Sequence, residues 1–184
     1  DFRLAEFSDE QLLRGLRGYY ACVDYVDDCI GGLLDGLREA GLLDNTCIIY
    51  TSDHGDMAAE LGLWCKRTFY DASAGVPLLI SLPGGQPRTS VDVPVELVDL
   101  LPTMCELAGT RAPEGIDGES LLPLLEGRSS DRCKRAARSE LLAPRREVQF
   151  RMARDERWKY VEFPETQPVL FDLESDPCET TNLY

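Results

Sequence analysis

The feature that most constrains the fold is a short apolar run that ends abruptly in polar residues. Residues 48–51 read Ile-Ile-Tyr-Thr and are followed directly by Ser52, Asp53, His54 and Gly55. Short apolar, β-branched runs bounded by turn residues are typical of fully buried strands. Open α/β sheets bind their ligands at the carboxyl ends of the strands. The run therefore predicts a buried strand that delivers two metal-type ligands, Asp53 and His54, to a ligand-binding edge.

The same residues also permit a simpler interpretation. An Asp-x-Gly sequence forms a turn by itself, without any metal ion. On the strand and turn alone this simpler interpretation is favoured, and the residues that follow decide between the two. The segment 53–75 is a long connection, and connections of this length in a compact domain usually have a function.

A long helix is predicted before the strand. Ser8 and Gln11 have the spacing of a capping box, and apolar residues then recur every three or four positions over 12–37. Gly41 is expected to end this helix, and the pair Gly31–Gly32 marks a point where it could break. A helix, a short turn and a buried strand form half of a βαβ unit, which indicates an α/β fold.

Shorter elements are predicted in the second half of the chain. They are, in order, a helix over 99–107, a short helix over 119–126, a hairpin of strands over 148–153 and 157–163, and a further strand over 169–173. The basic segment 128–138 is interpreted as a solvated linker. We therefore divide the chain into residues 1–127, part of an α/β domain, and residues 128–184, a small subdomain.

Three blocks around the strand occur together in a recognisable order. They are Thr-Ser-Asp-His-Gly-Asp at 51–56, Gly-Leu-Trp-Cys-Lys at 62–66 and Val-Pro-Leu-Leu-Ile at 76–80. Together they resemble the sulfatase family, a branch of the alkaline phosphatase superfamily, and the resemblance continues almost to the end of the chain. It implies an alkaline-phosphatase-like α/β fold, with part of a mostly parallel central sheet, flanking helices and a small C-terminal antiparallel sheet.

The resemblance also implies roles for three residues. Asp53 and His54 match two of the family's metal ligands, and Lys66 matches the lysine that contacts the sulfate and the leaving-group oxygen. His54 and Lys66 are thus the expected catalytic residues. The sequence departs from many members at Leu61, where they have His, and at Gly75, where they have Arg. These departures bear on the substrate class.

The expected cofactor is a divalent metal ion. A carboxylate with further oxygen ligands favours Ca²⁺, whereas an imidazole nitrogen also accommodates Mn²⁺, and Mg²⁺ is a further candidate. The family's nucleophile is a formylglycine made from Cys or Ser in a Cys/Ser-x-Pro-x-Arg pattern. No Cys or Ser in the sequence has Pro at +2 and Arg at +4. We therefore expect a C-terminal part of a larger enzyme, inactive by itself, with the formylglycine in an upstream part.

Three functions stay open at this stage. The resemblance favours a sulfuric ester hydrolase acting on a small-molecule sulfate ester. A phosphodiesterase or phosphonate monoester hydrolase of the same superfamily has the same Asp-His pair, so these motifs do not separate the two activities. A non-catalytic fragment that keeps the fold is the third hypothesis.

The composition of the chain limits the classes of partner that it can bind. A formal net charge of −14 disfavours nucleic acid and anionic membranes, which need a basic surface. No apolar run is long enough to span a bilayer. Seven cysteines, an odd number with no CxxC pair, favour reduced thiols and a cytoplasmic location. If an upstream part is missing, the apolar surface that it covered is expected to promote homo-oligomers.

Overall fold

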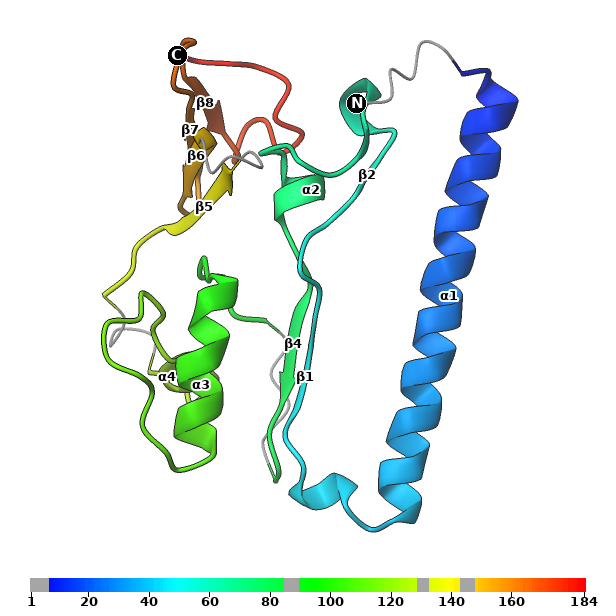
Figure 1. Cartoon of the computed structure of the whole chain (residues 1–184), viewed down its shortest axis with the longest axis vertical. Helices are drawn as coiled ribbons and strands as arrows, with labels where there is room; N and C mark the ends of the chain where they lie inside the picture. The colour runs from blue at the N-terminus through cyan, green and yellow to red at the C-terminus, as the bar shows by residue number, and fades with distance from the viewer. Residues whose placement is uncertain (1–6, 85–89, 129–132, 143–147) are drawn as a thin grey trace. The chain divides into compact units, whose positions relative to one another are not determined.

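The computed structural model describes residues 7–84, 90–128, 133–142 and 148–184 (Figure 1). The chain divides into two compact units, Asp1–Arg88 and Thr89–Tyr184. The first unit holds the long helix and the predicted strand over residues 48–51. The second holds short helices and an antiparallel sheet.

Helix α1 (Asp9–Glu39) begins at the predicted capping box. The backbone N–H of Ser8 donates to Gln11 Oε1 at 2.8 Å, and the N–H of Gln11 donates to Ser8 Oγ at 3.3 Å. The helix runs without interruption through Gly31–Gly32, so the break considered there does not occur. None of its residues is fully buried. In the described ranges, no helix is both long and apolar enough to cross a membrane.

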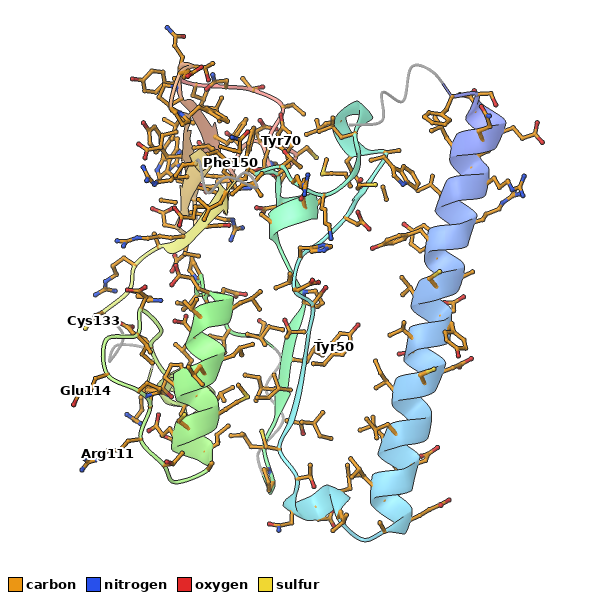
Figure 2. The ribbon with its side chains drawn as sticks, viewed as in Figure 1. Tyr50, Tyr70, Arg111, Glu114, Cys133 and Phe150 are labelled. Atoms are coloured by element: carbon orange, nitrogen blue, oxygen red, sulfur yellow. The ribbon has the colours of Figure 1, made fainter. Side chains whose placement is uncertain are left out.

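Strands β1 (Ile48–Thr51) and β4 (Leu78–Ser81) form an antiparallel ribbon in which Ile49 lies opposite Ile80. The short 3-10 helix η2 (Leu43–Asn45) leads into β1. The expectation of a fully buried strand is wrong for the described structure. Tyr50 is 40% exposed and projects from β1 (Figure 2), because this strand has a single partner and its faces are only partly covered.

The connection between β1 and β4 contains small elements of its own. They are β2 (Met57–Ala58), the 3-10 helix η3 (Glu60–Gly62), β3 (Trp64–Cys65) and α2 (Asp71–Ala74). Strands β2 and β3 pair antiparallel and bring the two ends of a tight loop together. Met57 is buried at the start of this ribbon. The long connection is therefore a folded excursion that begins and ends on the β1–β4 ribbon.

Among its described residues, the second unit combines three short helices with a sheet. The helices are η4 (Leu97–Asp99), α3 (Leu100–Leu107) and α4 (Leu122–Leu125). The antiparallel sheet has the order β5 (Ala137–Leu142), β6 (Val148–Arg154), β7 (Trp158–Glu162), β8 (Val169–Asp172). The predicted hairpin, the third strand and the two helices are confirmed. Strand β5 is an addition, and its first two residues, Ala137 and Arg138, fall within the segment predicted as a linker.

One face of this sheet is the core of the second unit. Alternate residues on neighbouring strands, Phe150, Met152, Val161 and Phe171, are buried together with the aliphatic part of Lys159. The alternation follows from the two-residue period of a strand, which places every second side chain on the same face. The Lys159 ammonium reaches the carboxylate of Glu179, which is also buried.

A buried carboxylate joins the helices to the start of the sheet region. Asp99 has no exposed surface, and its Oδ1 accepts hydrogen bonds from the Glu119 N–H at 2.9 Å and from Lys134 Nζ at 2.8 Å. Its Oδ2 accepts from the Glu96 N–H at 3.0 Å. Lys134 is thus held in place and is not part of a solvated linker. The predicted boundary between residues 127 and 128 stays a prediction.

This carboxylate predicts how stability depends on pH. Burial opposes ionisation of Asp99, but the hydrogen bonds from Lys134 and from the two amides outweigh it and lower its pKa. Because the pKa of Asp99 is lower in the folded state than its unfolded value of about 3.9, Asp99 stabilises the folded protein at pH values above about 3.9. This stabilisation is lost as the pH falls below that value through the folded-state pKa. We expect the stability of the second unit to fall below about pH 4, and Asp99→Asn to flatten that dependence.

Urea unfolding at a series of pH values measures this dependence in both proteins. Asp99→Asn lowers stability at neutral pH and leaves a shallower acid slope, because the residue no longer titrates. An acid slope that is equal in the two proteins contradicts the assignment.

Candidate functional site

The turn after β1 is closed by its own polar groups. The Ser52 hydroxyl donates to the His54 carbonyl oxygen at 2.7 Å, and the His54 N–H donates to Asp53 Oδ1 at 3.0 Å. Short side chains that bond to nearby backbone groups stabilise turns in this way. The strand therefore ends with the side chains of Asp53 and His54 fixed next to each other.

The His54 ring is oriented by the backbone. Its Nδ1 lies 2.7 Å from the Gly55 carbonyl oxygen. Because a carbonyl oxygen can only accept, Nδ1 carries the proton and Nε2 keeps its lone pair in the neutral ring. Nε2 lies 2.5 Å from Lys66 Nζ and 3.6 Å from Asp53 Oδ2. The structure thus brings together the three residues that the sequence singled out, Asp53, His54 and Lys66.

Gly55 is required by the close approach of another segment. A Cβ atom at this position would lie 2.1 Å from the Ala72 carbonyl oxygen and 2.7 Å from that of Gly75. The Gly55 N–H donates to the Ser73 carbonyl oxygen at 2.8 Å, and Ser73 is buried. The backbone around α2 therefore packs directly against the turn that carries Asp53 and His54.

Lys66 is placed by an unusual stretch of backbone. Cys65 and Arg67, its two neighbours, have φ values of 71° and 76°. Residues other than glycine adopt such left-handed conformations rarely, and at a cost that the surrounding structure must offset. In this chain the β2–β3 ribbon supports Cys65, which pairs with buried Met57. The ammonium is thereby directed at the His54 ring.

The donor set fits part of a metal site. Two ligands bound at 2.0–2.4 Å to one ion lie roughly 3–4 Å apart, and Asp53 Oδ2 and His54 Nε2 are 3.6 Å apart. The Asp53 side chain is 85% exposed and that of His54 35% exposed, so a further group can reach both. Across the described ranges no three His, Cys, Asp or Glu residues are grouped as a metal site requires. This pair supplies two donors, and a complete coordination shell needs others.

Sequence reasoning found the ionisable groups and missed those that hold them. The supporting groups are the hydroxyl of Ser52, the backbone of Gly55, which has no side chain, and the backbone carbonyl of Ser73. None of these gives a distinctive sequence signal. The glycine directly after His54 was the one available indication, because a glycine at a strand end often marks a close backbone approach.

The end of β1 thus presents a carboxylate, an imidazole nitrogen and an ammonium together, and a fixed ammonium can stabilise negative charge on a bound group. The family described as Sulfatase matches residues 4–110, and the family described as N-sulphoglucosamine sulphohydrolase, C-terminal, matches residues 59–184. The chain belongs to the sulfatase family, within the alkaline phosphatase superfamily. The predicted alkaline-phosphatase-like fold and the small C-terminal antiparallel sheet are confirmed. The expected parallel pairing is not seen among the described strands of the first unit, because β1 and β4 pair antiparallel.

Individual relatives match most or all of the chain. A choline-sulfatase of Rhizobium meliloti is 38% identical over all of this chain and 36% of its own length. The structure of a 2-O GAG sulfatase is 29% identical, with a TM-score of 0.87, over 96% of this chain and 40% of that one. The phosphonate monoester hydrolase of Agrobacterium radiobacter is 32% identical, with a TM-score of 0.77, over 90% and 36%. The chain thus spans about a third of the length of the curated relatives it matches.

Proposed function

We propose that this chain supplies part of the active site of a sulfuric ester hydrolase. The observation that carries the proposal is the convergence of Asp53, His54 and Lys66 at the end of β1, with His54 Nε2 2.5 Å from Lys66 Nζ. The family and its named sulfatases support the reaction class. The substrate is a small-molecule sulfate ester.

Asp53 and His54 are proposed to hold a divalent cation, with Ca²⁺ preferred and Mn²⁺ or Mg²⁺ as alternatives. When bound, such an ion supplies positive charge that stabilises negative charge developing on an ester's oxygens. The Gly55 carbonyl holds the proton on His54 Nδ1 and so leaves Nε2 free to coordinate. Because Lys66 donates to the same nitrogen, a cation bound there replaces this contact.

Lys66 is proposed to bind the sulfate group. An ammonium is a compact point charge suited to an anionic oxygen, and its position beside the proposed cation site puts two positive charges on the same group. The left-handed φ values of its two neighbours restrict the backbone that carries Lys66, and preorganised charges stabilise a transition state better than mobile ones because they need less reorganisation.

The chain alone is proposed to be inactive. It has two metal donors and no Cys/Ser-x-Pro-x-Arg pattern from which a formylglycine could form. The remaining donors and the nucleophile would then come from another part of a longer protein. Apolar residues exposed on α1, such as Tyr20 and Leu33, are available for contact with that part or for self-association. Light scattering of the 184-residue chain distinguishes a homo-oligomer from a monomer.

A phosphonate monoester hydrolase or phosphodiesterase is the second candidate. The structural similarity to the Agrobacterium radiobacter enzyme favours it, since the chain is as similar to that protein as to the 2-O GAG sulfatase in sequence. The two activities differ in the charge and geometry of the transferred group, which the residues of this chain do not by themselves discriminate.

Hydrolysis assays of the longer protein that carries this chain test the proposal. An aryl sulfate is expected to be the better substrate when compared with an aryl phosphate diester and a phosphonate monoester. Lys66→Ala should lower turnover more than about tenfold, and Asp53→Asn should lower the bound metal measured by mass spectrometry. Arg151→Ala removes an exposed charge from the second unit and is the control.

The three measurements separate the alternatives. A higher rate on the phosphate diester or the phosphonate replaces the sulfatase by the second candidate. A Lys66→Ala protein with full turnover removes this residue from the mechanism, and unchanged metal content in Asp53→Asn removes the proposed ligand. No hydrolysis of any of the three esters contradicts both hydrolase proposals.

A further inference from the structure

Helix α1 meets the loop that carries Lys66 at one glycine. A Cβ atom at Gly15 would lie 3.1 Å from Cη2 and 3.3 Å from Cζ2 of the Trp64 indole. The four other glycines of this helix would each place a Cβ in open space, with no atom within 4 Å; they are Gly18, Gly31, Gly32 and Gly36. Packing therefore depends on the lack of a side chain at Gly15, but not at the other four glycines.

The indole is closely linked to the candidate site. Trp64 pairs with Ala58 across the β2–β3 ribbon, and Lys66 follows two residues later. The residue between them, Cys65, has the left-handed φ of 71°, so this short backbone is bent into one conformation. A shift of the indole therefore moves the start of Lys66, whose ammonium lies 2.5 Å from His54 Nε2.

We propose that Gly15 is a positioning residue for Lys66, acting through Trp64. The helix surface at Gly15 forms a seat for the indole, and the seated indole sets how closely the Lys66 ammonium approaches the His54 ring. The role of the Gly15–Trp64 contact in catalysis rests on the proposed function, whereas the packing of the indole against Gly15 does not. Gly15 is not among the residues proposed to bind the cation or the sulfate group.

Helix propensity does not account for Gly15. Glycine is less favourable than alanine inside a helix, at every one of these five positions alike. Substitution at the four open positions should therefore favour the helix. At Gly15 the same substitution must also push the edge of the indole ring aside, and a larger side chain must displace it. This difference between Gly15 and Gly18, three residues apart on one helix, makes the inference testable.

The test uses the 184-residue chain and its single histidine. With one His in the sequence, the imidazole ¹⁵N spectrum reports on His54 alone. Lys66→Met, measured at a pH where the ring is neutral, defines the Nε2 shift that follows loss of the ammonium contact. Gly15→Leu is expected to move the Nε2 resonance in the same direction, Gly15→Ala to move it by a smaller amount, and Gly18→Leu to leave it at the wild-type position.

The outcomes are distinct from those of the hydrolysis assays. An unchanged His54 spectrum in Gly15→Leu, or an equal change in Gly18→Leu, overturns the proposal. An unchanged spectrum in Lys66→Met refutes the contact on which it rests. Circular dichroism confirms that helix content is kept, and Gly15→Ala keeps the test valid if the leucine variant does not fold. Because no substrate is present, a protein that hydrolyses no ester can still confirm the role of Gly15.

Discussion

Replacing Glu179 by alanine is expected to destabilise the second unit by about 3–5 kcal/mol. Lys159 and Glu179 form an ion pair in which both side chains are almost completely buried, on the same face of the sheet as Val161. Removing the carboxylate takes away the charge that the buried ammonium contacts, and an ammonium in a region of low dielectric is costly. Urea unfolding followed by circular dichroism measures the loss.

Two further variants isolate the cause. Arg151 pairs with Glu140 and Glu162 at 3.5 Å on the exposed side of the same sheet. Arg151→Ala should cost less than about 1 kcal/mol, because exposed pairs contribute little. The double variant Lys159→Met, Glu179→Leu should recover much of the loss, since an apolar pair leaves no buried charge. A loss in Glu179→Ala as small as that in Arg151→Ala contradicts the account.

Gly55→Ala is expected to have the second largest effect, a loss of about 3 kcal/mol in the first unit together with distortion of the candidate site. The added methyl would lie 2.1 Å from a backbone oxygen of Ala72, which cannot move without displacing α2. The turn must then separate from α2 and break the bond from the Gly55 N–H to the Ser73 carbonyl. Amide exchange at residue 55 and the His54 spectrum report both changes.

Gly36→Ala is the matched control for this substitution. Gly36 lies in α1, where an added methyl meets no atom within 4 Å, so the change should stabilise the helix by about 0.5–1 kcal/mol. The two variants alter the unfolded chain in the same way and differ only in the folded environment. Equal stability of Gly55→Ala and Gly36→Ala would show that the turn and α2 do not pack as described.

The candidate site was accessible to sequence reasoning because its key residues are close in the chain. Asp53 and His54 are adjacent, they end an apolar run, and Lys66 follows in a distinctive block. The capping box of Ser8 and Gln11 was predictable for the same reason, since a helix start depends on side chains within three or four residues. The metal and substrate roles of these residues stay predictions.

Contacts between distant parts of the chain were not predictable in this way. The burial of β1 was overestimated because an apolar run does not specify how many strands will pair with it, and within the described ranges β4 is its one partner. Lys134 was assigned to a solvated linker, yet it pairs with Asp99, 35 residues away. The basic composition around Lys134 gave no sign of that buried carboxylate.

The sequence by itself determined the local elements: the capped helix, the strand that ends in Asp53 and His54, and the alternation of the C-terminal hairpin. These follow from side-chain period and from hydrogen bonds between near neighbours. The tertiary structure alone decided that Lys66 reaches His54, that Gly15 receives Trp64 and that Gly55 faces α2. Such contacts depend on how the chain brings together segments that are 12 to 49 residues apart, and no local pattern encodes that arrangement.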